Sequence, residues 1–156
     1  MALVKYNNNS ISAVTSAAAI PSGALTHIKT LTASSSGTLS FVHGSSDVVL
    51  DSTYPIYVFK FINIHPATNT TKFQINASAD TGSNYNVTKT TTYFQAYHTE
   101  SDSATALQYY ANRDLAQSTA AQQLKDIGNT SDDSAAGILY LFNPSSSTFV
   151  KHFIST

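Results

Sequence analysis

Residues 56–65 read Ile-Tyr-Val-Phe-Lys-Phe-Ile-Asn-Ile-His, and the spacing of their apolar side chains is that of a β-strand. Successive side chains of a strand point to opposite faces, so even and odd positions form two separate rows. The apolar members are Ile56, Val58, Ile62 and Ile64 in one row and Tyr57, Phe59 and Phe61 in the other. Two apolar rows are typical of a strand that is covered on both sides. We therefore expect Phe61 to lie in the core, where Phe61→Ala would cost about 3–5 kcal/mol.

The sequence on either side of this stretch predicts more strands, separated by turn residues. The expected strands are residues 25–32, 38–42, 48–50, 56–65, 71–77, 84–98, 138–142 and 148–154. Residues 84–98 exceed the usual length of a strand, so we expect a bend or bulge there. Residues 65–69 predict a hairpin or another tight connection, and residues 143–147 predict a hairpin between the last two strands.

One region departs from the strand pattern. Residues 118–128 begin with Ser118, continue with good helix formers and end with Gly128, which predicts a short helix at about 118–127. The chain of 156 residues carries no internal repeat and no linker, so it fits one domain. We expect residues 1–156 to form a single, mainly β domain, an antiparallel β-sandwich or jelly roll with at most one short helix.

The composition excludes several classes of partner. Charged residues make up 11% of the chain, the formal net charge is −1, and there is no cysteine. Nucleic acids and anionic membranes attract clustered Lys and Arg, so we expect neither as a partner. Without cysteine there are no disulfides and no thiolate metal sites. No apolar run is long enough to span a membrane, and residues 1–10 lack the apolar segment of a signal peptide.

No motif in the chain predicts an enzyme. The sequence lacks G-x-S-x-G, G-x-G-x-x-G and G-x-x-x-x-G-K. Glu100 lies beside Asp102 in a polar cluster that predicts a turn rather than the carboxylate pair of a glycosidase. The five histidines lack the spacing of metal ligands, and Asp132-Asp133 lacks the calcium-loop pattern. We expect no catalytic residues, no metal and no cofactor.

The aromatic residues remain as a functional signal. The chain has nine Tyr and eight Phe, and many of the Tyr lie in polar surroundings. Such a Tyr suits protein contacts or stacking on sugars, and it also occurs at the rim of a core with its hydroxyl bonded to the backbone. The candidate contact residues are Tyr93, Tyr97, Tyr109, Tyr110, Phe149, Lys151 and Phe153. A glycan site would need two or three exposed Tyr in one shallow groove, with Asn or Asp beside them.

Three blocks of sequence are distinctive as strings: residues 61–69 (FINIHPATN), 85–91 (YNVTKTT) and 141–153 (LFNPSSSTFVKHF). With these blocks the chain resembles virion structural (hypothetical) proteins of marine tailed bacteriophages, over most of its length from about Leu25. The blocks carry no chemistry of their own. The resemblance implies a β-rich component located in the virion. We expect a head-decoration or cement protein first, because the chain lacks a repetitive shaft, and a tail-fibre-type module that binds host surface glycans second.

The last predicted strand is expected to leave an open sheet edge. Residues 148–154 are largely apolar, with Lys151 as their charged residue before His152. Proteins normally cover, shorten or charge such an edge. We therefore expect another chain to complete the edge or face beside these residues, as a homo-oligomer or by docking on other virion proteins of the capsid or tail.

Overall fold

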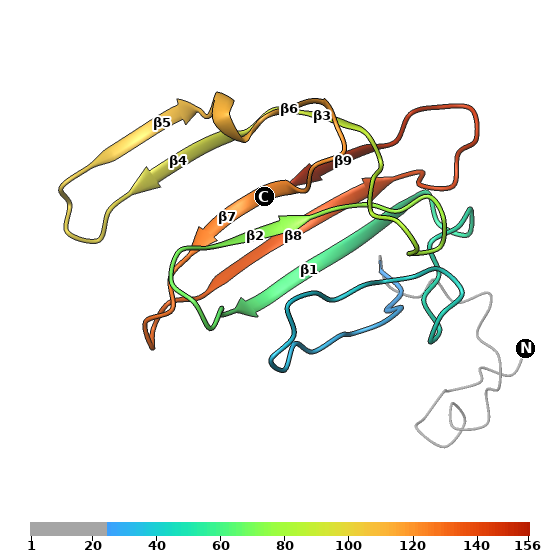
Figure 1. Ribbon diagram of the computed structural model, residues 1–156, viewed down its shortest axis with the longest axis horizontal. Helices are drawn as coiled ribbons and strands as arrows, with labels where there is room; N and C mark the ends of the chain where they lie inside the picture. The colour runs from blue at the N-terminus through green and yellow to red at the C-terminus, as the bar shows by residue number, and fades with distance from the viewer. Residues whose placement is uncertain (1–24) are drawn as a thin grey trace, which may run out of the picture.

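The computed structural model describes residues 25–156, and the expectation for residues 1–10 lies outside this range. Strands dominate the described residues, as predicted, and no helix there is long and apolar enough to cross a membrane. Figure 1 shows the elements: β1 (Ile56–Ile64), β2 (Thr71–Ile75), β3 (Lys89–Thr91), β4 (Phe94–His98), β5 (Thr105–Tyr109), the 3-10 turn η1 (Ala111–Arg113), β6 (Leu115–Ser118), β7 (Gln122–Ile127), β8 (Ala135–Phe142) and β9 (His152–Ser155).

The strands pair in a nested order. β1 pairs with β8, β2 with β7, β3 with β6 and β4 with β5, all antiparallel, and β9 adds to the free side of β8. The chain thus runs out along one side of a long hairpin and returns along the other. A jelly roll forms when such a hairpin folds over on itself, which brings β3 beside β8 and β4 beside β7 as additional strand pairs. Neither of these two pairs forms in the described residues. The antiparallel β architecture is confirmed, and the jelly roll is not.

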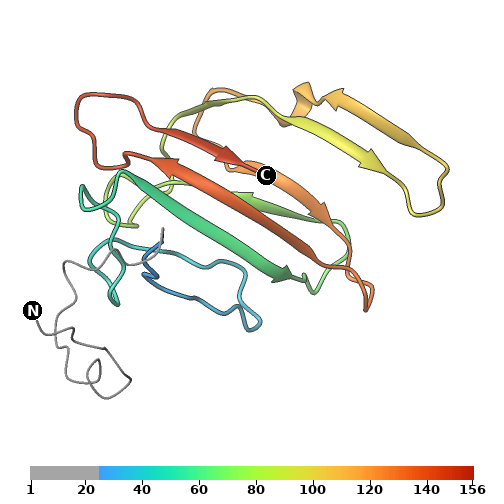
Figure 2. The ribbon, with the colours of Figure 1, turned by 180° about the vertical axis from the view of Figure 1, so that it is seen from behind.

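Two layers of strands form the body of the molecule. The sheet β1–β8–β9 is one layer, and the β2–β7 pair lies across it (Figures 1 and 2). Phe61 of β1 meets Phe73 of β2 with ring centroids 4.9 Å apart, and Phe59 meets Phe41 at 5.4 Å. Both contacts are edge-to-face, the arrangement that aromatic quadrupoles favour. The body is therefore sandwich-like, with coil from residues 38–50 completing its interior.

The core of this body is small. Among residues 25–156, the buried side chains are Val48, Tyr57, Gln122, Ile127 and Leu139. A compact domain of about 150 residues usually buries more than two thirds of the surface that its unfolded chain exposes. Many large apolar side chains stay in solvent instead, on β1, β4, β5, β8 and β9 and in the connection before β9.

A projecting hairpin is the most conspicuous feature of the outline. β4, β5 and the turn between them, here called the arm, extend beyond one end of the body in both views (Figures 1 and 2). In the described residues neither strand of the arm has a ladder with any strand but the other. An isolated two-stranded hairpin is at best marginally stable in water. The arm therefore needs support from its base or from a partner.

The structure corrects the predicted burial of β1. This strand lies at the edge of the order β1–β8–β9, and its side chains Ile56 and Ile62 are exposed. Only one row of β1 faces the interior, and Phe61 in that row is half-buried. We therefore expect Phe61→Ala to lower the free energy of unfolding by less than the truncation of a fully buried Phe, which typically costs about 3–5 kcal/mol.

Other predicted elements are also wrong. Residues 25–32, 38–42 and 48–50 form no strand. Residues 65–69 do make the predicted tight connection between β1 and β2, but it joins two sheets and is not a hairpin. The helix expected at 118–127 is absent, because most of that stretch forms β7. Pairing with β2 buries Gln122 and Ile127 of β7, and such tertiary contacts outweigh a weak local helix preference. The predicted break within 84–98 is confirmed, since the stretch divides into β3 and β4.

Candidate functional site

The structure separates the seven candidate contact residues into three places. Tyr97 and Tyr109 lie on the arm, Tyr93 and Tyr110 lie at its base, and Phe149, Lys151 and Phe153 lie at or just before β9. They do not form one site.

Arg113 organises the base of the arm. Its guanidinium carbon lies 5.1 Å from the ring centre of Tyr93 and 4.6 Å from that of Tyr110. Nη1 donates to the Tyr93 hydroxyl at 3.1 Å, and Nη2 forms an ion pair with Asp126 on β7. The Tyr93 hydroxyl in turn donates to the carbonyl of Leu124 at 2.9 Å. Tyr93 and Tyr110 therefore serve as structural anchors of the arm, which is the core-rim role that the sequence left open for them.

A buried glutamine extends this anchor into the body. The Thr91 hydroxyl of β3 donates to Oε1 of Gln122 on β7, and Nε2 of Gln122 donates to the carbonyls of Arg113 at 3.1 Å and Gln123 at 2.8 Å. Buried polar side chains are stabilising only when their hydrogen bonds are satisfied, and these are. The β3–β6 segment is thereby fixed to β7.

Replacing Arg113 by alanine is expected to lower the free energy of unfolding by about 1–3 kcal/mol. The change removes charge-assisted hydrogen bonds and two cation–π contacts, while partial exposure of Asp126 screens the ion pair. Urea unfolding followed by circular dichroism measures the loss. Arg113→Lys should recover only part of this loss, because the lysine ammonium lacks the planar guanidinium whose two nitrogens contact Tyr93 and Asp126. A loss below about 0.5 kcal/mol, the level expected for exposed Lys125→Ala on the same strand β7, would contradict the anchor.

One face of the arm is apolar towards its base and ends in His98 and Thr105 at the tip. The register places Phe94 opposite Tyr109 and Ala96 opposite Leu107, on the same side of the hairpin. We call these four residues the apolar stripe. Phe94 is 69% exposed and Leu107 81%, and the rings of Phe94 and Tyr109 lie 5.3 Å apart. The sequence prediction missed Phe94 and Leu107, although the alternation within 94–98 and 105–109 carries this signal once the two strands are paired.

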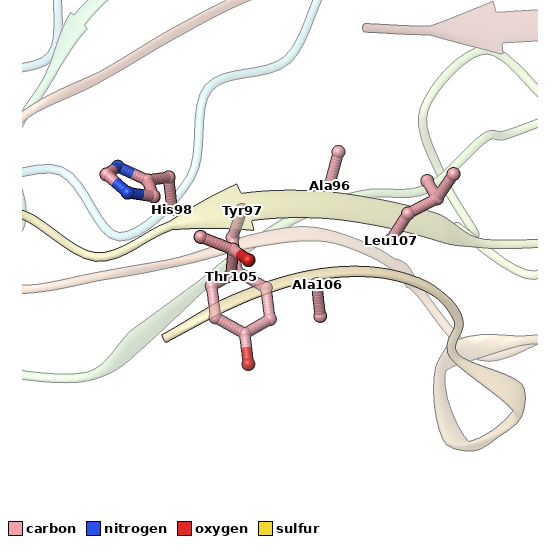
Figure 3. A pocket seen from close by; sticks show the side chains of 6 residues that line it. All are labelled: Ala96, Tyr97, His98, Thr105, Ala106 and Leu107. Atoms are coloured by element: carbon pink, nitrogen blue, oxygen red, sulfur yellow. The ribbon is translucent and has the colours of Figure 1, made fainter. Parts of the chain in front are cut away.

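Tyr97 lies on the other side of the arm. It stands opposite Ala106, and Figure 3 shows these two side chains pointing away from Ala96 and Leu107. A shallow depression on the hairpin is bordered by residues of both sides, among them Tyr97 and Leu107. Tyr97 and Tyr109 therefore do not share a groove, as a Tyr-lined glycan site would require.

The hydroxyl of Tyr109 is hydrogen-bonded at the base of the arm. Its hydroxyl donates to the carboxylate of Asp114, which raises the pKa of Tyr109. The other oxygen of that carboxylate accepts the backbone N–H of Tyr93 at 2.7 Å. With its hydroxyl turned to Asp114, the ring of Tyr109 offers mainly apolar surface to a partner.

A second apolar surface covers the exposed side of the β1–β8–β9 sheet. Cross-strand pairing aligns Val58 of β1, Tyr140 of β8 and Ile154 of β9, and it places Ile56 opposite Phe142. We call these five residues the outer face. Ile154 is 57% exposed, Ile56 and Tyr140 are also exposed, and a shallow hollow beside them is lined by Leu25, Tyr54 and Pro55 as well.

The three candidates at β9 have different surroundings. Phe149 is exposed in the connection that precedes β9, whereas Phe153 is half-buried opposite Leu141. Lys151 donates from Nζ to the carbonyl of Ser146. Within the described residues β9 pairs only with β8, so its far edge is open, and completion of that edge by another chain stays a prediction.

No three His, Asp or Glu side chains of residues 25–156 converge as metal ligands. His98 and Asp102 pair at 2.7 Å, but both are well exposed at the tip of the arm. Glu100 lies in the same turn, where the sequence placed it.

Asp80 closes the connection between β2 and β3. Its Oδ1 accepts the Ser78 hydroxyl at 2.6 Å and the backbone N–H of Asn84 at 2.8 Å, and its Oδ2 accepts the side-chain amide of Asn84 at 2.6 Å. The Ser78 bond first, and the Asn84 bonds after it, lower the pKa of Asp80 to about 2.

We expect this loop to open in acid. The pKa of Asp80 is below its ordinary value of 3.8, so ionised Asp80 stabilises the loop above that pH, and the stabilisation is lost as the pH falls through about 2. The backbone amide signal of Asn84 in NMR spectra should report the transition. Asp80→Asn should remove the pH dependence of that signal. A midpoint near the ordinary value would show that the carboxylate is free in the folded protein.

Comparison with known proteins adds no relative. No protein-family model matches the sequence, and no curated protein or solved structure matches the chain.

Proposed function

We propose that the protein is a bacteriophage virion structural protein, a capsid decoration or cement protein that acts through protein–protein contacts. The observation that supports this most is the grouping of exposed apolar side chains on the stripe and the outer face. Monomeric proteins rarely expose contiguous apolar patches above a few hundred Å², and larger patches mark interaction sites. The resemblance of residues 61–69, 85–91 and 141–153 to phage virion proteins suggests the kind of assembly.

The sparse charge of the chain agrees with this role. With 11% charged residues, contacts between copies or with a capsid would rest on apolar burial rather than ion pairs. Surface ion pairs are weakened by salt, whereas apolar contacts are not. An attachment of this kind would persist in sea water.

Immunogold labelling of purified phage particles, with antibodies against this protein, tests the location. We expect gold on the heads, and quantitative mass spectrometry should find many copies per particle. Gold confined to tail tips would support the adsorption module instead. Particles that lack the protein altogether would contradict both roles.

The second candidate is a tail-fibre-type module that binds host surface glycans. It is favoured by the exposed Phe94–Tyr109 ring pair with the carboxylate of Asp114 beside it. Aromatic faces stack on sugar rings, and carboxylates accept hydroxyl groups. Binding of host polysaccharide that is lost in Tyr109→Ala and kept in Tyr97→Ala would establish this role. Equal binding by both variants and the wild type would exclude the stripe as the glycan site.

A further inference from the structure

We propose that the apolar stripe of one copy docks on the outer face of the β1–β8–β9 sheet of a second copy, and that the exchange is reciprocal in a two-fold dimer. The proposal deepens the proposed function, because it rests on the same two apolar surfaces, and the purified chain tests it apart from the location of the protein in a virion. It assigns a partner to both apolar surfaces at once.

The arm lacks the support that a stable hairpin needs. Sheets become independently stable when three or more strands share an apolar face, or when a face packs against another element. The stripe is such a face, yet Phe94 and Leu107 lie in solvent, and no third strand joins the arm in the described residues. Another apolar surface therefore has to cover the stripe.

The arm is held away from the body of its own chain. Arg113 and Gln122 fix its base to β7, and the arm continues from there beyond the end of the body (Figures 1 and 2). The stripe is thus directed to solvent, while the outer face lies on the body, on β1, β8 and β9. A second copy can cover the stripe with its outer face and cover the outer face with its stripe.

The exposed area is sufficient for a stable dimer when the exchange is reciprocal. The six most exposed members are Phe94, Leu107 and Tyr109 of the stripe and Ile56, Tyr140 and Ile154 of the outer face. A large side chain presents about 150–250 Å² when fully exposed, and weighting this area by the six exposed fractions gives roughly 650 Å² in all. Two-fold symmetry forms the contact twice and buries about 1,300 Å², which lies within the range of specific interfaces. A single, non-reciprocal contact would fall below it.

The charges that border the two surfaces are complementary. Lys60 lies in the same row of β1 as Ile56 and Val58 on the outer face, and it is exposed. Asp114 lies beside Tyr109 at the base of the arm, and Asp102, which pairs with His98, lies at its tip. Opposite charges at the rim of an apolar contact favour one partner and one orientation. Two stripes facing each other would instead bring these Asp residues together.

Disulfide crosslinking tests the contact, because the chain has no cysteine of its own. Differently tagged Leu107→Cys and Tyr140→Cys copies are mixed and oxidised, and we expect a disulfide between the two tags. Gln108→Cys, the neighbouring position on the opposite face of the arm, is the matched control and should give none. A Leu107→Cys protein that crosslinks only with itself would overturn the proposal.

Sedimentation equilibrium supplies an independent measurement. Leu107→Asp changes a side chain that is 81% exposed, so the chain should still fold, as circular dichroism would verify. We expect its dimer dissociation constant to rise at least about a hundredfold, because a buried Leu is lost twice in a two-fold dimer. Gln108→Asp should have a much smaller effect.

Two further outcomes would overturn the proposal. The first is a wild-type chain that is monomeric at micromolar concentration. The second is an intramolecular disulfide in the Leu107→Cys/Tyr140→Cys double variant at high dilution, which would show that the arm folds back on its own body.

Discussion

Replacing Tyr57 by alanine is expected to lower the free energy of unfolding by about 3–5 kcal/mol, the usual cost of truncating a buried aromatic side chain. Tyr57 is 3% exposed in a core with few members, so little else can compensate. Its hydroxyl donates to the carbonyl of Asp51 and accepts the N–H of the same residue, both at 3.0 Å. The side chain therefore fills the interior and also fixes the coil before β1. Urea unfolding followed by circular dichroism measures the loss.

Tyr57→Phe is the matched control. It keeps the ring in place, including the edge contact with Tyr54 at 5.8 Å, and removes only the hydroxyl with its hydrogen bonds to Asp51. We expect it to cost about 1–3 kcal/mol, because the Asp51 groups lose their partner. If Tyr57→Ala cost no more than Tyr57→Phe, the ring would contribute nothing by burial and its assignment to the core would be wrong.

Leu139→Ala is expected to have the next largest effect, about 2–5 kcal/mol. Leu139 is 6% exposed in the middle of β8, the central strand of its sheet, between Phe59 of β1 and Ser155 of β9. Truncation leaves a cavity that three hydrogen-bonded strands cannot collapse around. Given that domains are stable by only about 5–15 kcal/mol, the variant should unfold at clearly lower urea concentration.

Val150→Ala serves as the comparison for Leu139→Ala. Val150 is apolar too, but it is 78% exposed in the connection before β9, so its truncation should cost less than about 0.5 kcal/mol. The ratio between the two losses reports burial rather than residue type. Losses of similar size would contradict the placement of β8 at the centre of the packed layer.

The sequence predicted strands where the local pattern is sufficient. Apolar–polar alternation located β2, and the apolar runs located β1 and β8. Successive side chains of a strand point to opposite faces, so a strand with one buried face alternates apolar and polar residues. The turn residues 143–147 likewise predicted the β8–β9 hairpin. These signals lie within a few residues of one another and need no knowledge of partners.

What failed depends on distant parts of the chain. Two apolar rows on β1 suggested cover on both sides, but the row that contains Ile56 and Ile62 is open in this structure. Nothing within 56–65 distinguishes a row covered by the same chain from one left for a partner. The helix prediction at 118–127 failed for a related reason, since β7 exists through its pairing with residues 71–75.

The candidate site was predicted only in part. Tyr109 was identified from its polar surroundings, and it lies on the exposed stripe. The same criterion selected Tyr93, whose surroundings are filled by Arg113 and by the carbonyl of Leu124. Phe94 and Leu107 were overlooked because a stripe across two strands becomes visible only when their register is known. Single residue types predict exposure poorly, whereas paired strands predict it well.

The nested pairing has a consequence for the kinetics of folding. Residues near the tip, such as His98 and Thr105, are close in sequence, whereas Ile56 must find Phe142. The entropic cost of loop closure grows with loop length, and each inner pair that forms shortens the loop left for the next. Folding is therefore expected to proceed from the tip towards β1 and β8, at the slow rates of chains rich in non-local contacts. Substitutions in the arm would then retard folding, while those in β1, which must pair with the distant β8, would mainly accelerate unfolding.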